Sequence, residues 1–211
     1  KISSMETSSE QNVCSTSYYF GIAMNKIFSF LLFAFIISCQ PIEQIEEVVF
    51  DNSQLSKINI LSKDIEVKTT FEKKITDPYI GHTLRIEPSQ RIANWINDNF
   101  KAIGNENKLE VVILDSSLLK TEFENKDTKN FDEKKNYKYE LFYLIEFNLY
   151  DDSNNLVAST LVETIRSTTS GVYISIQNTE KVIDDLVYLS LLDLSLESNK
   201  LLKQYMSDFI L

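Results

Sequence analysis

The clearest hydrophobic pattern in the chain is a strict alternation from Tyr137 to Tyr150, in which apolar residues occupy every second position. A period of two is typical of a β-strand with one buried face. The polar turn sequence DDSNN follows, so Leu156 to Arg166 is predicted to return as the antiparallel partner in a hairpin. Two earlier apolar runs predict further strands, at Ile58 to Val67, with a bulge or an edge position near Ser62, and at Leu109 to Leu119.

Two segments have the three- and four-residue spacing of amphipathic helices. The first begins at Pro88, which suits a first helical turn, carries Trp95 on its apolar stripe, and is expected to end at Gly104. The second runs from about Thr179 to Phe209, with a kink expected at Ser198-Asn199. The order of elements predicts an α+β fold of the type β-α-β-β-β-α. Its architecture is expected to be a four-stranded, mostly antiparallel sheet with both helices packed on one face.

A short apolar run, Ile27 to Ile37, precedes these elements. Its 11 residues are too few to cross a bilayer, which takes about 20 in a helix. Lys26 lies before the run and Ser38 after it, as in a secretory signal with a basic and an apolar region. The stretch Ile36-Ile37-Ser38-Cys39 resembles the bacterial lipobox, in which the cysteine is acylated and becomes the first residue of the mature chain. The alternatives are an ordinary cleaved signal beside a cysteine, and a short buried helix.

The signal divides the chain into four parts. Met24 directly precedes the signal pattern, so residues 1–23 are interpreted as a non-native upstream segment and residues 24–38 as the lipoprotein signal peptide. Residues 39–56 are acidic and lack a sustained period, which is typical of a tether between a lipidated Cys39 and a folded domain. Residues 57–211 are long enough for a single α+β domain with a substantial core.

Charge and cysteine content exclude several classes of function. The formal net charge of −10 at pH 7 disfavours binding to nucleic acid, which depends on Lys and Arg neutralising phosphates, and docking on anionic lipid. The chain has two cysteines, Cys14 in the upstream segment and Cys39 in the lipobox. A mature lipidated chain therefore has no thiol for a disulfide, a metal site or a nucleophile.

The remaining polar residues do not form a catalytic pattern. His82 is the only histidine, which excludes a multi-histidine zinc site, and Ser116-Ser117 lie in a strand pattern without a G-x-S-x-G motif. The turn at Asp151 imitates the start of a calcium loop, yet Leu156 occupies the position that needs glycine. We expect no enzyme activity, no metal and no cofactor apart from the covalent lipid on Cys39.

The chain also resembles a family of uncharacterised lipoproteins from alphaproteobacteria over roughly residues 58–211. In the order of its elements and in its lipobox, that family is similar to the auxiliary lipoproteins of ABC-type lipid-transport systems and to lipoproteins of outer-membrane assembly. The resemblance implies a protein of the cell envelope and supplies no catalytic residues. The stretches that carry it are IGHTLRIEPSQRIANWINDNFKAIGNENKLEVVILDSSLLKTEF, YELFYLIEFNLYD, ETIRSTT and the long acidic and apolar C-terminal helix.

The favoured hypothesis is a non-enzymatic accessory or scaffold lipoprotein, anchored on the periplasmic side of the envelope, that binds another protein of a lipid-transport or outer-membrane assembly complex. Gln40 follows the cysteine where an inner-membrane lipoprotein of enteric bacteria has aspartate, which favours the outer membrane. Leu191, Leu192 and Leu196 widen the apolar stripe of the last helix, so we expect them to form the partner surface.

The alternative hypothesis is a lipoprotein that holds an acyl chain or another small hydrophobic ligand between sheet and helices. It predicts a pocket of a few hundred Å³ lined by Phe142, Leu144 or Trp95. A filled core with an exposed apolar patch would instead favour the accessory protein.

Overall fold

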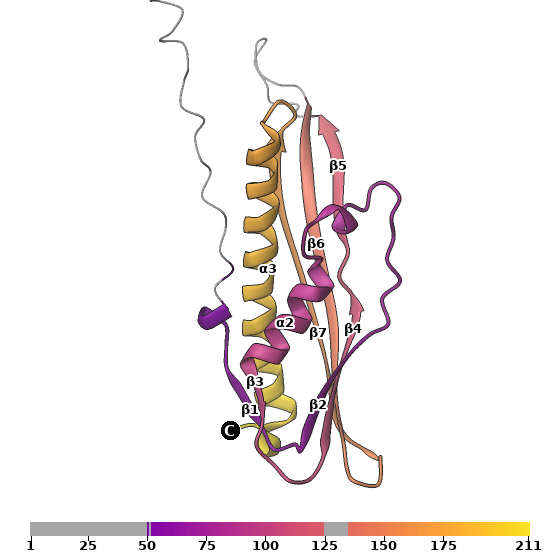
Figure 1. The fold of residues 1–211 in the computed structure, drawn as a ribbon, viewed down its shortest axis with the longest axis vertical. Helices are drawn as coiled ribbons and strands as arrows, with labels where there is room; N and C mark the ends of the chain where they lie inside the picture. Colours follow the sequence, from indigo (N-terminus) through magenta and orange to yellow (C-terminus); the bar gives the residue numbers. More distant parts are fainter. Residues whose placement is uncertain (1–49, 51, 125–134) are drawn as a thin grey trace, which may run out of the picture. The chain divides into compact units, whose positions relative to one another are not determined.

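The sheet is organised around one long strand, β6 (Lys135–Tyr150), in the computed structural model of the protein (Figure 1). β7 (Leu156–Gly171) pairs antiparallel with one side of β6 along its whole length. On the other side of β6, β4 (Lys108–Asp115) and β5 (Leu118–Glu124) pair with it one after the other. β2 (Asp64–Thr69) then pairs parallel with β4, which makes a sheet of five strands. The long hairpin predicted from the alternating pattern is thereby confirmed.

The structure describes residue 50, residues 52–124 and residues 135–211. They belong to one compact unit, Glu47–Leu211. Within these described ranges, no helix is both long and apolar enough to cross a membrane.

The expectation of four mostly antiparallel strands is wrong in the number of strands and in their orientation. The predicted strand Leu109 to Leu119 is interrupted at Ser116-Ser117, where the backbone N–H and the hydroxyl of Ser117 donate hydrogen bonds of 2.9 and 2.6 Å to the Asp115 carboxylate. This local turn separates β4 from β5. β2 and β4 are parallel, and the chain between them includes the helix α2. Parallel neighbours need such a crossover, whereas a tight hairpin would have made them antiparallel.

The first predicted strand and the end of the first helix also differ from the expectation. Residues 58–67 divide into β1 (Ile58–Ile60) and the start of β2. The helix α2 (Pro88–Asn99) ends earlier than Gly104, because the next residues form β3 (Phe100–Ala102), which pairs parallel with β1 in a separate two-stranded sheet. Gly104 has another role. A Cβ there would lie 2.8 Å from the carbonyl carbon of Leu61, so glycine lets the two backbone segments approach each other.

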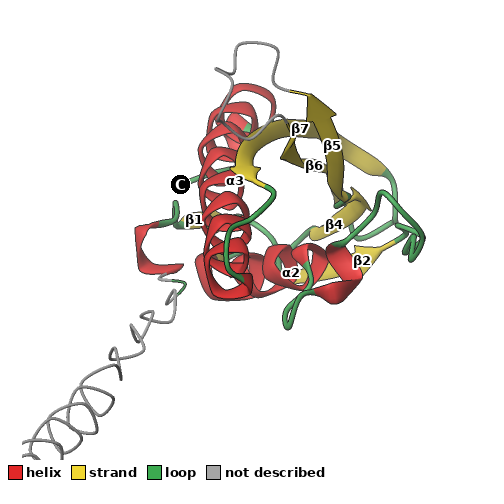
Figure 2. Cartoon of the chain, turned by 90° about the horizontal axis from the view of Figure 1, so that it is seen from above, coloured by secondary structure: helices red, strands yellow, loops and turns green. Residues whose placement is uncertain are grey.

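The last helix, α3 (Ile176–Tyr205), is continuous through Ser198-Asn199, the position where a kink was expected. It begins at Ser175, whose hydroxyl accepts a hydrogen bond of 3.2 Å from the backbone N–H of Asn178. Ser198 faces the interior and is fully buried. Both helices cover the same, concave side of the curved sheet, as expected (Figure 2).

The space between the sheet and the helices is filled by large side chains. Trp95 of α2 is fully buried and meets the edge of Phe100, with ring centroids 5.4 Å apart. Phe100 in turn stacks on Phe147 of β6 at 5.7 Å. The other inward residues of β6 are also buried: Tyr139, Leu141, Tyr143, Ile145 and Leu149. The aromatic and aliphatic face predicted from the alternation is therefore core.

Part of the predicted tether packs on the domain. Residues 52–54 form a short 3-10 helix, η2 (Asn52–Gln54), and Leu55 is buried in the core. The side-chain amide of Asn99 holds this segment by donating hydrogen bonds of 3.1 Å to the carbonyl oxygens of Asn52 and Leu55. Phe50 contacts the ring of Tyr188, at a centroid distance of 5.6 Å. The predicted lipid attachment site, Cys39, and the signal peptide before it lie outside the described residues.

Candidate functional site

The convex face of the sheet is not covered by any helix that the structure describes (Figure 2). Residues of even number on β6 and of odd number on β7 point to this face, because their neighbours on each strand are the buried residues of the core. The strand register places Phe142 opposite Ile165 and Leu144 opposite Glu163. The uncovered face is therefore partly apolar along the hairpin.

Four side chains form this apolar patch: Phe142, Leu144, Leu161 and Ile165. Leu161 is 51% exposed and Ile165 is 59% exposed, whereas the two residues of β6 are partly buried. Glu163 lies directly opposite Leu144 and is a diagonal neighbour of Phe142. Glu146 lies opposite Leu161. We call these four residues the hairpin patch. Its apolar surface is bordered by carboxylates.

The rest of the uncovered face has a different character. Over β2 and β4, oppositely charged side chains pair with one another. Lys108 is bonded to Glu66 at 2.5 Å, and Lys68 is bonded to Glu110. The hydrogen bond from Lys108 lowers the pKa of the Glu66 carboxyl below its ordinary value. The apolar and charged parts of the face are thus separated along the sheet.

A cavity of about 210 Å³ lies where α3 runs beside β7. Its lining residues are Arg166, Ser167, Thr168, Val182, Asp185, Leu186 and Leu189. Beside this cavity an ion pair joins β7 to α3: the Arg166 guanidinium lies 2.5 Å from the Asp193 carboxylate. Because β7 is the last strand of the sheet, this cavity lies beside the open edge of the sheet.

The structure places the three predicted partner residues in different environments. Leu191 is only 1% exposed and belongs to the core, so the expectation that it lies on a surface is wrong. Leu192 is partly buried against the core. Leu196 is 57% exposed and remains a candidate for partner contact. The reason is the rotation of α3: Leu191 and Leu194 point to the core, whereas Leu196 lies on the exposed side of the helix.

The residues proposed for a ligand pocket do not line one. Trp95 and Tyr143 are buried in packed core, and Phe142 and Leu144 point to the opposite face of the sheet. Burial raises the pKa of the Tyr143 hydroxyl above its ordinary value, so this group stays protonated. Neither described cavity is lined by Trp95, Phe142 or Leu144.

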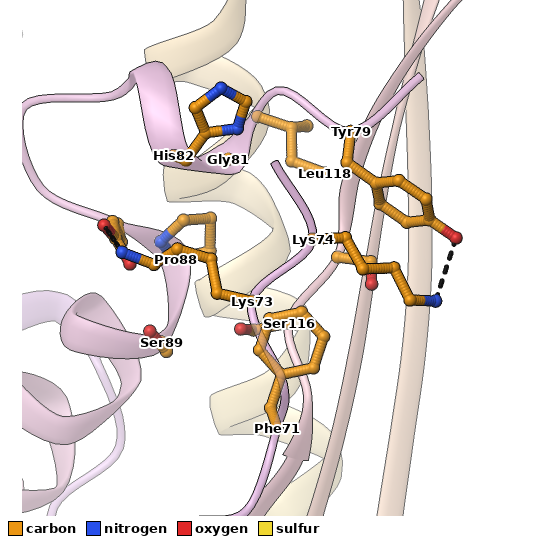
Figure 3. A pocket seen from close by; sticks show the side chains of 12 residues that line it. Phe71, Lys73, Lys74, Tyr79, Gly81, His82, Pro88, Ser89, Ser116 and Leu118 are labelled. Carbon is orange, nitrogen blue, oxygen red and sulfur yellow. Dashed lines mark hydrogen bonds and ion pairs between the residues drawn. The ribbon is translucent and has the colours of Figure 1, made fainter. Parts of the chain in front are cut away.

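His82 lies beside a second, much smaller cavity, near the short 3-10 helix η3 (Gly81–Thr83) (Figure 3). About 20 Å³ is room for roughly one water molecule. The ammonium of Lys74 donates a hydrogen bond of 3.0 Å to the Tyr79 hydroxyl, which raises the pKa of Lys74. His82 is exposed and lies apart from this pair, and Ser116 is buried. This geometry does not assemble a nucleophile with a base.

Acidic, histidine and cysteine side chains do not gather into a group that could hold a metal ion anywhere in residues 50, 52–124 and 135–211. The turn at Asp151 has another function. Its carboxylate accepts hydrogen bonds of 2.8 and 2.9 Å from the backbone and side-chain nitrogens of Asn155. These bonds close the hairpin between β6 and β7 and lower the pKa of Asp151.

Leu161, Ile165 and Glu163 were not predicted as site residues. The sequence LVETI carries apolar residues on both faces of a strand, at Leu161 and Ile165 on one and Val162 on the other. Such a pattern on the last strand of a hairpin is a signal that a second surface needs to be covered. It cannot by itself tell which face the helices occupy.

No family model and no curated protein matches this chain. Among solved structures, a minor lipoprotein from Acinetobacter baumannii matches with a TM-score of 0.37 and 10% identity, over 71% of this chain and 94% of that chain. The rare lipoprotein B from Shewanella oneidensis matches with a TM-score of 0.35 and 14% identity, over 65% and 93%.

A further match is a homologue of a neuraminyllactose-binding hemagglutinin from Helicobacter pylori, with a TM-score of 0.30 and 9% identity over 67% of this chain and 89% of that chain. Two of these three proteins are described as bacterial lipoproteins. With TM-scores below 0.5, these likenesses assign neither a family nor a function to this chain. The resemblance to an alphaproteobacterial family and to ABC auxiliary lipoproteins finds no support in the comparisons.

Proposed function

We propose that this protein is a lipid-anchored, non-enzymatic accessory protein of the bacterial envelope, which binds a protein partner through the hairpin patch. The proposal places the domain on the periplasmic side, held by an acylated Cys39. It further assigns the partner to a complex for lipid transport or outer-membrane assembly, a step that rests on the sequence resemblance alone.

The observation that carries the proposal is the contrast between a filled core and an exposed apolar patch. The concave side of the sheet is occupied by buried side chains, so the fold does not need Leu161 and Ile165 for its own packing. Single exposed apolar residues are ordinary, but a contiguous group rimmed by polar residues is typical of a protein interface. Glu146 lies at the border of the patch, opposite Leu161, and Glu163 adds a carboxylate within it, opposite Leu144.

Binding of an acyl chain is the second candidate, and the cavity between α3 and β7 is the observation that favours it. At about 210 Å³ it is smaller than typical ligand sites, which are roughly 300–1,000 Å³. Arg166 and Asp185 also place charges in its wall, where an acyl chain would need an apolar lining. Native mass spectrometry of protein gently extracted from membranes would reveal such a lipid as a bound mass that denaturation removes.

The anchor is tested by Cys39→Ser. Because one acylated cysteine would carry the attachment, this variant should leave the membrane fraction and lose labelling by a fatty-acid probe. Fatty-acid label retained on the variant would contradict the lipoprotein assignment.

The surface is tested by the double variant Leu161→Glu and Ile165→Glu. Both side chains are more than half exposed, so the domain should remain folded by circular dichroism, and the partner that co-purifies with the wild type should be lost. The matched control is Thr69→Glu and Thr121→Glu, which adds the same charge to exposed positions on β2 and β5, away from β7. Equal partner recovery in both double variants would contradict the proposed surface.

A further inference from the structure

We propose that the open edge of β7 binds an extended strand of the partner, a strand with alternating apolar residues and at least one basic side chain, so that the sheet continues from this protein into the partner. This inference rests on the proposed function, since it specifies how the partner is held. It involves the edge of the sheet as well as the face that carries the hairpin patch.

The first observation is the length of the unpaired edge. β7 is 16 residues long and pairs with β6 on one side; α3 runs beside it, but no strand in the described part of the chain pairs with its other side. In an antiparallel pair, about every second residue directs its N–H and C=O away from the neighbour, so a row of backbone donors and acceptors lines this edge. Such an edge is a template for strand addition.

The second observation is that apolar side chains border this edge on both sides. On the convex side lie Leu161 and Ile165. On the concave side, Leu189 of α3 lines the cavity against β7 and is 37% exposed. Leu196 lies seven residues further along α3, which places it on the same side of the helix about two turns away.

These positions match the two faces of an added strand. Neighbouring residues of a strand point to opposite faces, so one set of its side chains would contact Leu161 and Ile165 while the other set would lie toward Leu189 and Leu196. The cavity of about 210 Å³ beside β7 gives the inward set room to enter. A partner that only rested on the convex face would leave the α3 side uncovered.

The third observation is charge, and it favours a basic partner over a second copy of this chain. Glu163 lies between Leu161 and Ile165 on the convex side, and Asp185 is exposed on the α3 side. A two-fold antiparallel pairing of two β7 strands that sets Leu161 opposite Ile165 also sets Glu163 opposite Glu163. Like charges directly opposite are destabilising, and each copy carries a net charge of −10.

The test uses site-specific photo-cross-linking of the full-length lipid-anchored protein in its native membranes. p-Benzoylphenylalanine is placed at Ser167 and Leu189, which lie on the two sides of the open edge. Phe142 on the convex face and Lys68 on β2 carry the same probe as comparison sites. Cross-linked peptides are identified by mass spectrometry, and equal amounts of each variant in the membrane fraction control for folding.

The expected result is that the probes at Ser167 and Leu189 attach to the same short segment of one partner. This segment should alternate apolar and polar residues and contain Lys or Arg, and the two probes should attach to residues that point to opposite faces of it. The probe at Lys68 should give no partner product. Glu163→Lys should lower the yield at least about tenfold, and Glu163→Gln should lower it less.

Other results separate this inference from the proposed function. Partner products from Phe142 but from neither edge site would overturn strand addition and leave an accessory protein that binds through its sheet face. Products that join two copies of this chain, or edge-site products on unrelated segments, would also overturn strand addition. No partner product from any site would overturn both.

Discussion

The edge strands β2 and β7 differ in length and in the chemistry of the side chains beside them. β2 is six residues long, and its outward side chains Glu66 and Lys68 are bonded to charged residues of β4. β7 is 16 residues long and carries Leu161, Glu163 and Ile165 on the same face. Both are edge strands of the same sheet, as β5 also is, and of the two β2 has the usual protections of an edge.

This difference favours β7 over β2 as the edge that another strand joins. Short length and paired charges on an edge strand discourage another strand from joining it. A long edge with exposed apolar residues would favour unwanted association if it stayed bare, and the proposed partner strand would cover it. The same sheet is closed at β2 and open to binding at β7.

The largest effect is expected from a matched pair of substitutions on α3, which separates the core side of the helix from the side that borders β7. Leu191→Glu should destabilise the domain by more than about 4 kcal/mol, because it buries a carboxylate among apolar side chains. Leu196→Glu should change stability by less than about 0.5 kcal/mol, since this position is exposed. Urea unfolding of both variants tests this, and similar costs would contradict the orientation of α3.

A second pair of substitutions sharpens the account of the β2 side. Gly104→Ala should cost about 1–3 kcal/mol, because its Cβ would meet backbone atoms of Leu61 and Ser62 at 2.8 and 2.9 Å, just before β2 begins. Gly81→Ala is the control, with its nearest neighbours at 3.7 and 3.8 Å, in ordinary contact. The urea midpoint of Gly104→Ala should therefore be lower than that of Gly81→Ala. Equal midpoints would show that the backbone near Leu61 moves aside to make room for the added Cβ.

The smallest effect concerns the charges that protect β2. The pKa of Glu66 is lowered mainly by its hydrogen bond from Lys108, so its carboxyl should titrate below its ordinary value of 4.5 in the folded protein. Since the folded pKa is the lower one, its stabilising contribution is present above the unfolded pKa and is lost as pH falls through the folded pKa. Lys108→Gln should move the Glu66 midpoint, measured by NMR, upward. An unchanged midpoint would show that the pair is not formed in solution.

The sequence predicts the elements whose patterns are local. β6 and β7 were predictable because strict alternation and the DDSNN turn specify a hairpin without reference to the rest of the chain. The break at Ser116-Ser117 was missed although Asp115, Ser116 and Ser117 interrupt the apolar run, because polar residues also occur within strands and this turn depends on bonds to the Asp115 carboxylate. The end of α2 was missed because Phe100 also fits the helical stripe, and its strand conformation comes from pairing with β1.

The candidate site was harder to predict than the fold. Leu161 and Ile165 belong to a strand that the pattern identifies, but their exposure depends on which face of the sheet α2 and α3 cover. Leu191 and Leu196 were grouped as one surface, although a difference of five residues turns a side chain about 140° around a helix. Exposure depends on contacts between segments distant in sequence, and those contacts are a property of the whole domain.

The most direct measurement of the central claim is amide hydrogen exchange on the protein in two states, as the isolated domain and as the complex extracted gently from membranes. Strand addition at β7 predicts slower exchange at alternating amides within Leu156–Gly171 in the complex, while the amides of Asp64–Thr69 in β2 exchange at the same rate in both states. Unchanged exchange along β7, or protection that appears at β2 instead, would contradict the assignment of β7 as the edge that holds the partner.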